Sequence, residues 1–152
     1  MVDIPLLKES LGTIRKVFIS LPSAHCQIQA GFYRAFFIGP WWLRLTAMPS
    51  IALSGLKGWQ GKKFFDQYQA TNIVLTKEGL IEKLTMTCKV GTSLVDGEEG
   101  VALHYGLEAP VPWRWIKDEI RILDDQTFLC MTVIDLPLLR KLSFPFILRR
   151  ES

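Results

Sequence analysis

The sequence predicts a mainly β protein, an antiparallel β-barrel of about eight strands preceded by an N-terminal helix. Short runs of β-forming residues recur between residues 28 and 151. Brief turns rich in Gly, Pro and Asp separate these runs, which favours antiparallel hairpins. A row of hairpins leaves two exposed edges, and closure into a barrel removes both. A barrel of this size is either filled by side chains or holds one small ligand.

Length and composition predict one domain spanning residues 1–152. Hydrophobic residues make up 49% of the chain and charged residues 22%, which is typical of a globular protein. The formal net charge of +3 is too small to indicate a nucleic-acid partner. The sequence contains no signal peptide and no apolar run long enough to cross a bilayer, so we expect a cytoplasmic protein without a transmembrane segment.

Two helices are predicted before the regular β pattern begins. Residues 4–20 predict an amphipathic helix. Its apolar stripe consists of Leu7, Leu11, Ile14 and Phe18. Residues 28–38 predict the first strand, and residues 41–52 a short apolar helix interrupted at Pro49. This second helix is expected to pack over the barrel as a cap.

The remaining strands are predicted from their composition and alternation. They cover residues 58–65, 72–76, 80–90, 101–107, 113–123, 127–135 and 143–151. Alternation is clearest in the strand of residues 80–90. Its predicted apolar face consists of Leu80, Leu84, Met86, Cys88 and Val90.

The strand of residues 113–123 places a carboxylate on its apolar face. Asp118 lies between Ile116 and Ile120 on that face, whereas Glu119 and Arg121 lie on the opposite face, which is predicted to be exposed. A buried carboxylate without a partner is costly, so Asp118 should be protonated or paired, for example with an arginine. It is therefore a candidate acid or base in the cavity, or else one half of a structural ion pair.

Both faces of the strand of residues 127–135 are apolar. The outer face must therefore be covered, either by the N-terminal helix or by a second copy of the chain in a homodimer.

Histidines and the tryptophan between two glycines are further candidates. His104 is a second candidate catalytic residue because its ordinary pKa suits proton transfer near neutrality. His25 is predicted to lie in a loop. Trp59 is flanked by Gly58 and Gly61, and its indole needs a partner such as Arg149 or Arg150. Lys62 and Lys63 are interpreted as solvated charges near a strand end.

We predict a ligand-binding set from strand parity alone. It consists of Tyr33, Phe36, Trp59, Met86, Met131, Phe146 and Arg150. Cys26, Cys88 and Cys130 are widely spaced and odd in number, which indicates free thiols rather than a disulfide framework or a metal site.

Four segments resemble the bacterial GXWXG-type, lipocalin-like domains of unknown function. They are Gly31–Ala35, Gly58–Phe64, Asp118–Asp125 and Phe144–Arg150. In the first segment, Tyr33 and Ala35 stand where the pattern has tryptophan and glycine. The resemblance implies a calycin-like barrel with an apolar pocket, and it implies no particular reaction.

Several functions follow as hypotheses from these observations. The first is binding of a small hydrophobic molecule, such as a lipid, terpenoid or polyketide-like compound, with no cofactor. The second is a cyclase, isomerase or dehydratase that uses Asp118 or His104 as acid or base in the same cavity. The third is a haem-binding barrel with His104 as the ligand, and the fourth is an interaction module whose barrel is plugged by aromatic side chains.

Overall fold

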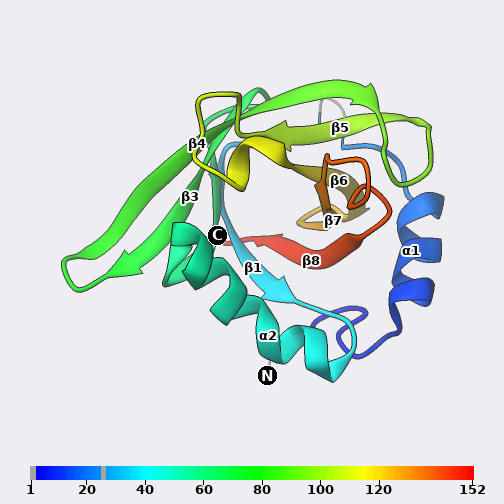
Figure 1. Ribbon diagram of the computed structural model, residues 1–152, viewed down its shortest axis with the longest axis horizontal. Coiled ribbons are helices and arrows are strands. Elements are labelled where there is room, and N and C mark those ends of the chain that lie inside the picture. The colour runs from blue at the N-terminus through cyan, green and yellow to red at the C-terminus, as the bar shows by residue number, and fades with distance from the viewer. Residues whose placement is uncertain (1–2, 25–26) are drawn as a thin grey trace.

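The computed structural model describes residues 3–24 and 27–152 (Figure 1). Eight strands form a closed barrel in which each strand pairs with the next in antiparallel fashion, and the last strand closes onto the first. The strands are β1 Gly31–Phe37, β2 Trp59–Phe64, β3 Gln69–Thr76, β4 Gly79–Thr92, β5 Glu99–His104, β6 Ile116–Asp124, β7 Thr127–Ile134 and β8 Ser143–Arg150. The predicted fold class is therefore confirmed.

Helix α1 spans Leu11–Ser20, so it begins seven residues later than the sequence predicts. The side chain of Ser10 accepts a hydrogen bond from the backbone N–H of Thr13, which is a preferred way to begin a helix. Leu6 has a φ of 62°, which lies outside the helical region and excludes a helix from residue 4 onward. At the other end the helix ends at Ser20, and Leu21, which precedes Pro22, already has an extended backbone.

Helix α1 lies outside the ring of strands and covers the outer face of β7 (Figure 1). Its buried residues Ile14 and Phe18 belong to one cluster with three outward-facing residues of β7: Leu129, Met131 and Val133. The prediction that this helix covers the doubly apolar strand is confirmed. The homodimer was proposed to cover the same face, so this strand no longer supports it.

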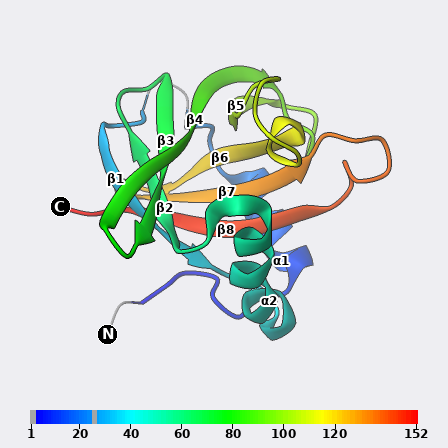
Figure 2. The same ribbon diagram turned by 60° about the vertical axis from the view of Figure 1, so that its left-hand side comes forward.

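Helix α2 spans Trp41–Ile51 and continues into one π-helical turn, Ala52–Leu56. Pro49 stands inside the helix rather than ending it. The two views place α2 beside β1 and β8, across one end of the barrel (Figures 1 and 2). A short 3₁₀ turn, Trp113–Trp115, precedes β6 near the same end.

A β-bulge in β2 changes which side chains point into the barrel. The register with β3 shifts between Trp59 and Gly61, so Trp59 and Lys62 both point inward although three positions separate them. Gly61 has a φ of 153°, and a β-carbon there would collide with the carbonyl oxygen of Tyr33. Glycine at this position therefore allows β2 to approach β1 closely.

A second bulge interrupts β4, so the apolar face predicted for this strand is not continuous. Between Lys83 and Met86 the register with β3 shifts, and Leu84 has a φ of 61°. Met86 points inward as predicted, whereas Leu80 and Val90 are exposed. Figure 1 shows the β3–β4 hairpin extending beyond the rest of the barrel, which explains why Leu80 has no core to face.

Candidate functional site

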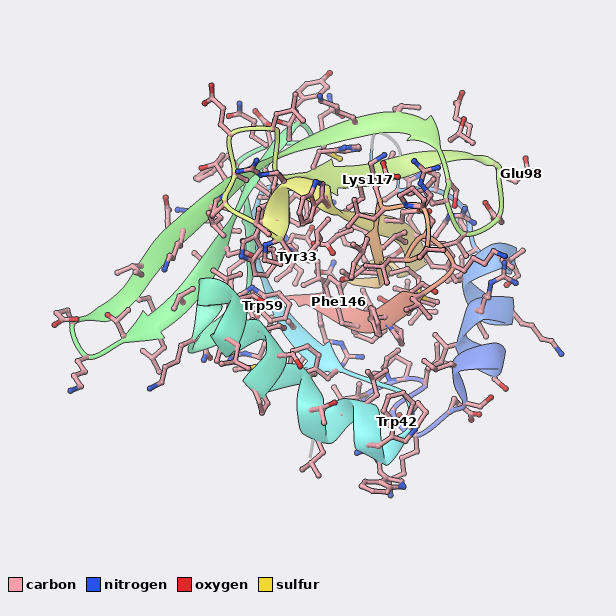
Figure 3. The ribbon with its side chains drawn as sticks, viewed as in Figure 1. Tyr33, Trp42, Trp59, Glu98, Lys117 and Phe146 are labelled. Carbon is pink, nitrogen blue, oxygen red and sulfur yellow. The ribbon has the colours of Figure 1, made fainter. Side chains whose placement is uncertain are left out.

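A cavity of about 360 Å³ lies inside the barrel at the end covered by α2. Strands β2, β6 and β8 contribute apolar walls, and helix α2 forms one side of the opening. Among the apolar lining residues are Phe37, Ala47, Trp59, Trp113, Ile116 and Phe146. Figure 3 shows Trp59 and Phe146 next to each other, and their rings meet edge to face with centroids 5.6 Å apart. The cavity contradicts a barrel fully plugged by aromatic side chains.

A buried ion pair lies in the wall of this cavity. The ammonium of Lys62 on β2 and the carboxylate of Asp118 on β6 are 2.9 Å apart. Lys62 is 1% exposed and Asp118 is 3% exposed. They are the charged side chains that line the cavity among the described residues. Asp118 therefore points inward as the sequence predicts, but its partner is a lysine instead of an arginine.

Side chains from β3, β4 and β7, and from the residue that follows β5, complete the environment of the pair. Besides Asp118, the Lys62 ammonium donates to the Asn72 amide oxygen and to the Tyr105 hydroxyl, each at 3.1 Å, and the Met86 sulfur lies 3.3 Å from it. The other oxygen of Asp118 accepts a hydrogen bond of 2.7 Å from the Thr132 hydroxyl. Every charged atom of the pair thus has a partner, as a buried charge requires.

Asn72 connects the pair to the aromatic wall. Its amide oxygen also accepts a hydrogen bond of 3.0 Å from the indole N–H of Trp59, and its amide nitrogen donates to the Tyr105 hydroxyl at 3.2 Å. The indole therefore finds its partner inside the barrel, which corrects the prediction of an arginine from residues 149–150. The Lys62 ammonium also lies 5.5 Å from the Trp59 ring centroid.

The protonation states of the cluster follow from burial and neighbouring charge. Burial by itself lowers the pKa of Lys62, but the adjacent Asp118 carboxylate outweighs it, so the pKa of Lys62 is raised above its ordinary range. Burial raises the pKa of Tyr105, although Lys62 opposes this. At neutral pH the lysine is therefore charged and the tyrosine hydroxyl keeps its proton.

Lys62, Asn72, Tyr105 and Thr132 belong to the site although the sequence does not predict them there. Lys62 was interpreted as a solvated charge, because strand alternation without the bulge at Gly61 gives no reason for a lysine to point inward. Asn72 is the first residue of the predicted strand of residues 72–76, and the sequence gives no signal that its side chain points inward. Tyr105 follows His104 directly, so assigning the inward face to His104 assigned the opposite face to Tyr105.

His104 lies on the outside of the barrel, contrary to prediction. Leu103 is buried in the interior cluster, and alternation places His104 on the other face of β5. Burial lowers the pKa of His104, and the nearby positive charges of Lys117 and Lys89 lower it further. It does not line the cavity. His25 and Cys26 lie outside the described residues.

Five of the predicted ligand-binding residues, Tyr33, Phe36, Met86, Met131 and Arg150, do not line the cavity either. Phe36 and Met131 face outward and pack in the cluster beneath α1, because β1 and β7 carry the opposite parity from that assumed. Tyr33 is buried in the interior, but it stacks on Phe128 and donates its hydroxyl to the Gln29 carbonyl at 3.0 Å. Arg150 donates to the Ala30 carbonyl at 2.8 Å. Met86 is buried in the interior next to Lys62, and Trp59 and Phe146 do line the cavity.

Two residues that the sequence predicts to be exposed are buried, Arg121 under α1 and Glu119 under the β4–β5 loop. Arg121 donates to the Phe18 carbonyl at 3.1 Å and pairs with Asp96 at 2.9 Å. Glu119 accepts hydrogen bonds from the Ser93 hydroxyl and from the backbone N–H of Leu94. The prediction of an exposed face was wrong because the helix and the β4–β5 loop cover it. These bonds attach both segments to β6 on the side of the strand opposite to the cavity.

Comparison with known proteins supports the fold and does not extend to function. The chain is similar to the crystal structure of a protein from Thermomonospora curvata, with a TM-score of 0.71 and 18% sequence identity, over 95% of this chain and 90% of that one. At this identity the similarity shows the fold alone. No protein-family model matches the sequence, and no curated protein is detectably similar to it.

Two further observations concern residues 3–24 and 27–152. Among the residues in these two ranges, no three His, Cys, Asp or Glu side chains gather in a way that could hold a metal ion. None of the helices in these ranges is both long enough and apolar enough to cross a membrane.

Proposed function

We propose that this protein binds one small, mainly apolar molecule in the barrel cavity. The observation that carries the proposal is a cavity of about 360 Å³ with a mainly apolar wall and one compact cluster of buried, hydrogen-bonded polar side chains. Ligand sites of roughly 300–1,000 Å³ combine these two features, because apolar surface supplies affinity and a few polar groups supply orientation. A lipocalin-like carrier, as the sequence resemblance implies, uses the same arrangement.

The polar cluster supports binding because it is held in place before any ligand arrives. Lys62, Asn72 and Asp118 come from three different strands and are connected by hydrogen bonds of 3.1 Å or less. A cluster that is already ordered loses little conformational entropy when a ligand binds. The cluster is therefore suited to orient a ligand at one fixed point of a mainly apolar pocket.

Titration with the fluorescent apolar probe N-phenyl-1-naphthylamine tests the proposal. We expect saturable binding with one probe per chain. The variant Ala47→Phe places a ring in the cavity from α2 and should abolish binding, whereas Ala52→Phe, a half-buried residue outside the cavity lining, should not. Binding that is unaffected by Ala47→Phe, or absent in the wild-type protein, would contradict the proposal. Native mass spectrometry of the purified protein would show whether a molecule is retained.

A second candidate function is catalysis in the same cavity by a cofactor-independent cyclase, isomerase or dehydratase. The observation that favours it is the Asp118 carboxylate in the cavity wall, 2.9 Å from a charged lysine. Asp118 is the candidate base, and His104 is not because it does not line the cavity.

Deuterium exchange into the methyl group of 2-acetylnaphthalene in heavy water tests this candidate. Catalysed exchange should occur in the wild-type protein and disappear in the paired variant Lys62→Met/Asp118→Leu, which removes both charges together. Bound ketone without accelerated exchange would leave binding as the function. The haem hypothesis required His104 in the cavity, and the position of that residue gives it no support.

A further inference from the structure

The Tyr105 hydroxyl accepts hydrogen bonds without donating one to any described residue. It accepts from the Lys62 ammonium at 3.1 Å and from the Asn72 amide at 3.2 Å. A phenolic hydroxyl carries one proton of its own, which it donates when an acceptor is available. The tyrosine is 9% exposed and is one of the residues that line the cavity, so bulk water has little access to this proton.

The direction of both hydrogen bonds is determined by chemistry. A charged ammonium has no lone pair and can only donate. The Asn72 amide presents its nitrogen to Tyr105 because its oxygen already accepts from the Trp59 indole and from Lys62. Neither neighbour can therefore accept the Tyr105 proton, and the remaining direction open to it is the cavity.

The charge of the cluster restricts which acceptor can enter. Lys62 and Asp118 carry opposite charges and are the charged side chains of the cavity lining within the described residues. Their sum is zero, so a ligand carboxylate would be buried without compensating charge, at high cost. A neutral oxygen acceptor meets no such penalty. The Lys62 ammonium also polarises the hydroxyl to which it donates, which strengthens the hydrogen bond that Tyr105 gives.

We propose that Tyr105 is the recognition group of the cavity and donates a hydrogen bond to the neutral carbonyl oxygen of an apolar ligand, such as a ketone, aldehyde or ester. Lys62 and Asn72 orient the hydroxyl and do not contact the ligand oxygen themselves. This assignment rests on the proposed binding function and adds the chemical class of the ligand. It predicts discrimination in two directions, against a hydrocarbon that lacks the oxygen and against a carboxylate that adds a charge.

Three naphthalenes of closely similar shape separate these possibilities: 2-acetylnaphthalene, 2-ethylnaphthalene and 2-naphthoate. Their dissociation constants are measured by displacement of N-phenyl-1-naphthylamine. In the wild-type protein the ketone should bind about tenfold more tightly than the hydrocarbon, as expected of one good hydrogen bond. The carboxylate should bind more weakly than the ketone.

Two variants assign the preference to Tyr105. Tyr105→Phe should bind the ketone and the hydrocarbon with equal affinity and leave the hydrocarbon constant within about twofold, because one hydroxyl is lost and the ring remains. Tyr33→Phe is the matched control, since its hydroxyl bonds to Gln29 and does not line the cavity. It should keep the wild-type preference.

Infrared spectroscopy of ketone labelled with ¹³C at the carbonyl gives a readout that a purely structural role would not change. A hydrogen bond lowers the carbonyl stretching frequency, so the bound frequency should rise in Tyr105→Phe and stay unchanged in Tyr33→Phe. The outcomes are distinct. If no naphthalene binds the wild-type protein, the proposed function fails and the assignment fails with it. If the hydrocarbon binds but the ketone has no Tyr105-dependent advantage, or the carboxylate binds most tightly, the assignment alone is overturned.

Discussion

Lys62 on β2 and Asp118 on β6 come from opposite walls of the barrel, and their charged atoms lie 2.9 Å apart in its interior. Strands β2 and β6 are not neighbours in the sheet, so the pair joins two walls that share no backbone hydrogen bond. Both residues are nearly inaccessible to water. The pair therefore contributes both to the stability of the barrel and to the polarity of the cavity wall.

Removing one partner of this pair should strongly destabilise the protein. We expect Lys62→Met to lower the free energy of unfolding by about 3–5 kcal/mol, because it leaves a buried carboxylate without its counter-charge. The paired variant Lys62→Met/Asp118→Leu should recover most of this loss. Urea denaturation measures both. The control is Lys63→Met, which removes an exposed lysine paired with Glu82 and should change stability by less than about 1 kcal/mol. Equal effects at residues 62 and 63 would contradict the importance of the pair.

The same lysine should make stability depend on pH in the alkaline range. Its folded pKa is raised above the ordinary value of 10.5, so folding retains a proton that the unfolded chain releases. Its contribution is complete below pH 10.5 and decreases as the pH rises above this value, by about 1.4 kcal/mol per pH unit for one proton. Urea denaturation between pH 10 and pH 11.5 should show a shallower decline in Lys62→Met/Asp118→Leu than in Lys63→Met. Parallel declines would exclude this linkage.

Helix α1 should contribute substantially to stability through one aromatic side chain. Phe18 is fully buried, and the Arg121 guanidinium lies 4.5 Å from its ring centroid. Phe18→Ala should lower the free energy of unfolding by about 3–5 kcal/mol, because it leaves a cavity beneath the helix. The adjacent Ile19 is 40% exposed, and Ile19→Ala should have a much smaller effect. Thermal unfolding of both variants provides the measurement, and a small effect of Phe18→Ala would show that the helix is dispensable.

The two described cysteines should differ from exposed thiols in reactivity. Burial raises the pKa of Cys130 well above its usual range, and it raises the pKa of the half-buried Cys88 to about 11. Since the thiolate is the reactive form, Cys130 in a Cys26→Ser/Cys88→Ser variant should react with iodoacetamide only after denaturation. Mass spectrometry follows the modification with and without urea. Rapid labelling of the folded variant at pH 8 would contradict the burial of this residue.

Strand parity explains where prediction of the site succeeded. Asp118, Ile116 and Ile120 alternate without interruption along β6, so their inward direction could be predicted from spacing alone. Lys62 could not be predicted in this way, because the bulge beside Gly61 shifts the parity of β2. The sequence offers one signal for such a shift, the glycines on both sides of Trp59, and a bulge is one of several conformations that they permit.

By itself the sequence determined that the chain forms eight antiparallel strands with an N-terminal helix, and that one carboxylate enters an apolar interior. These features depend on the alternation of apolar residues and on turn residues, and both can be recognised within short segments of the chain. Only the tertiary structure decided that Lys62 meets Asp118, Asn72 and Tyr105, and that α1 rather than solvent covers Arg121. Those contacts join residues up to about a hundred positions apart, and their partners depend on bulges and register that local patterns do not specify.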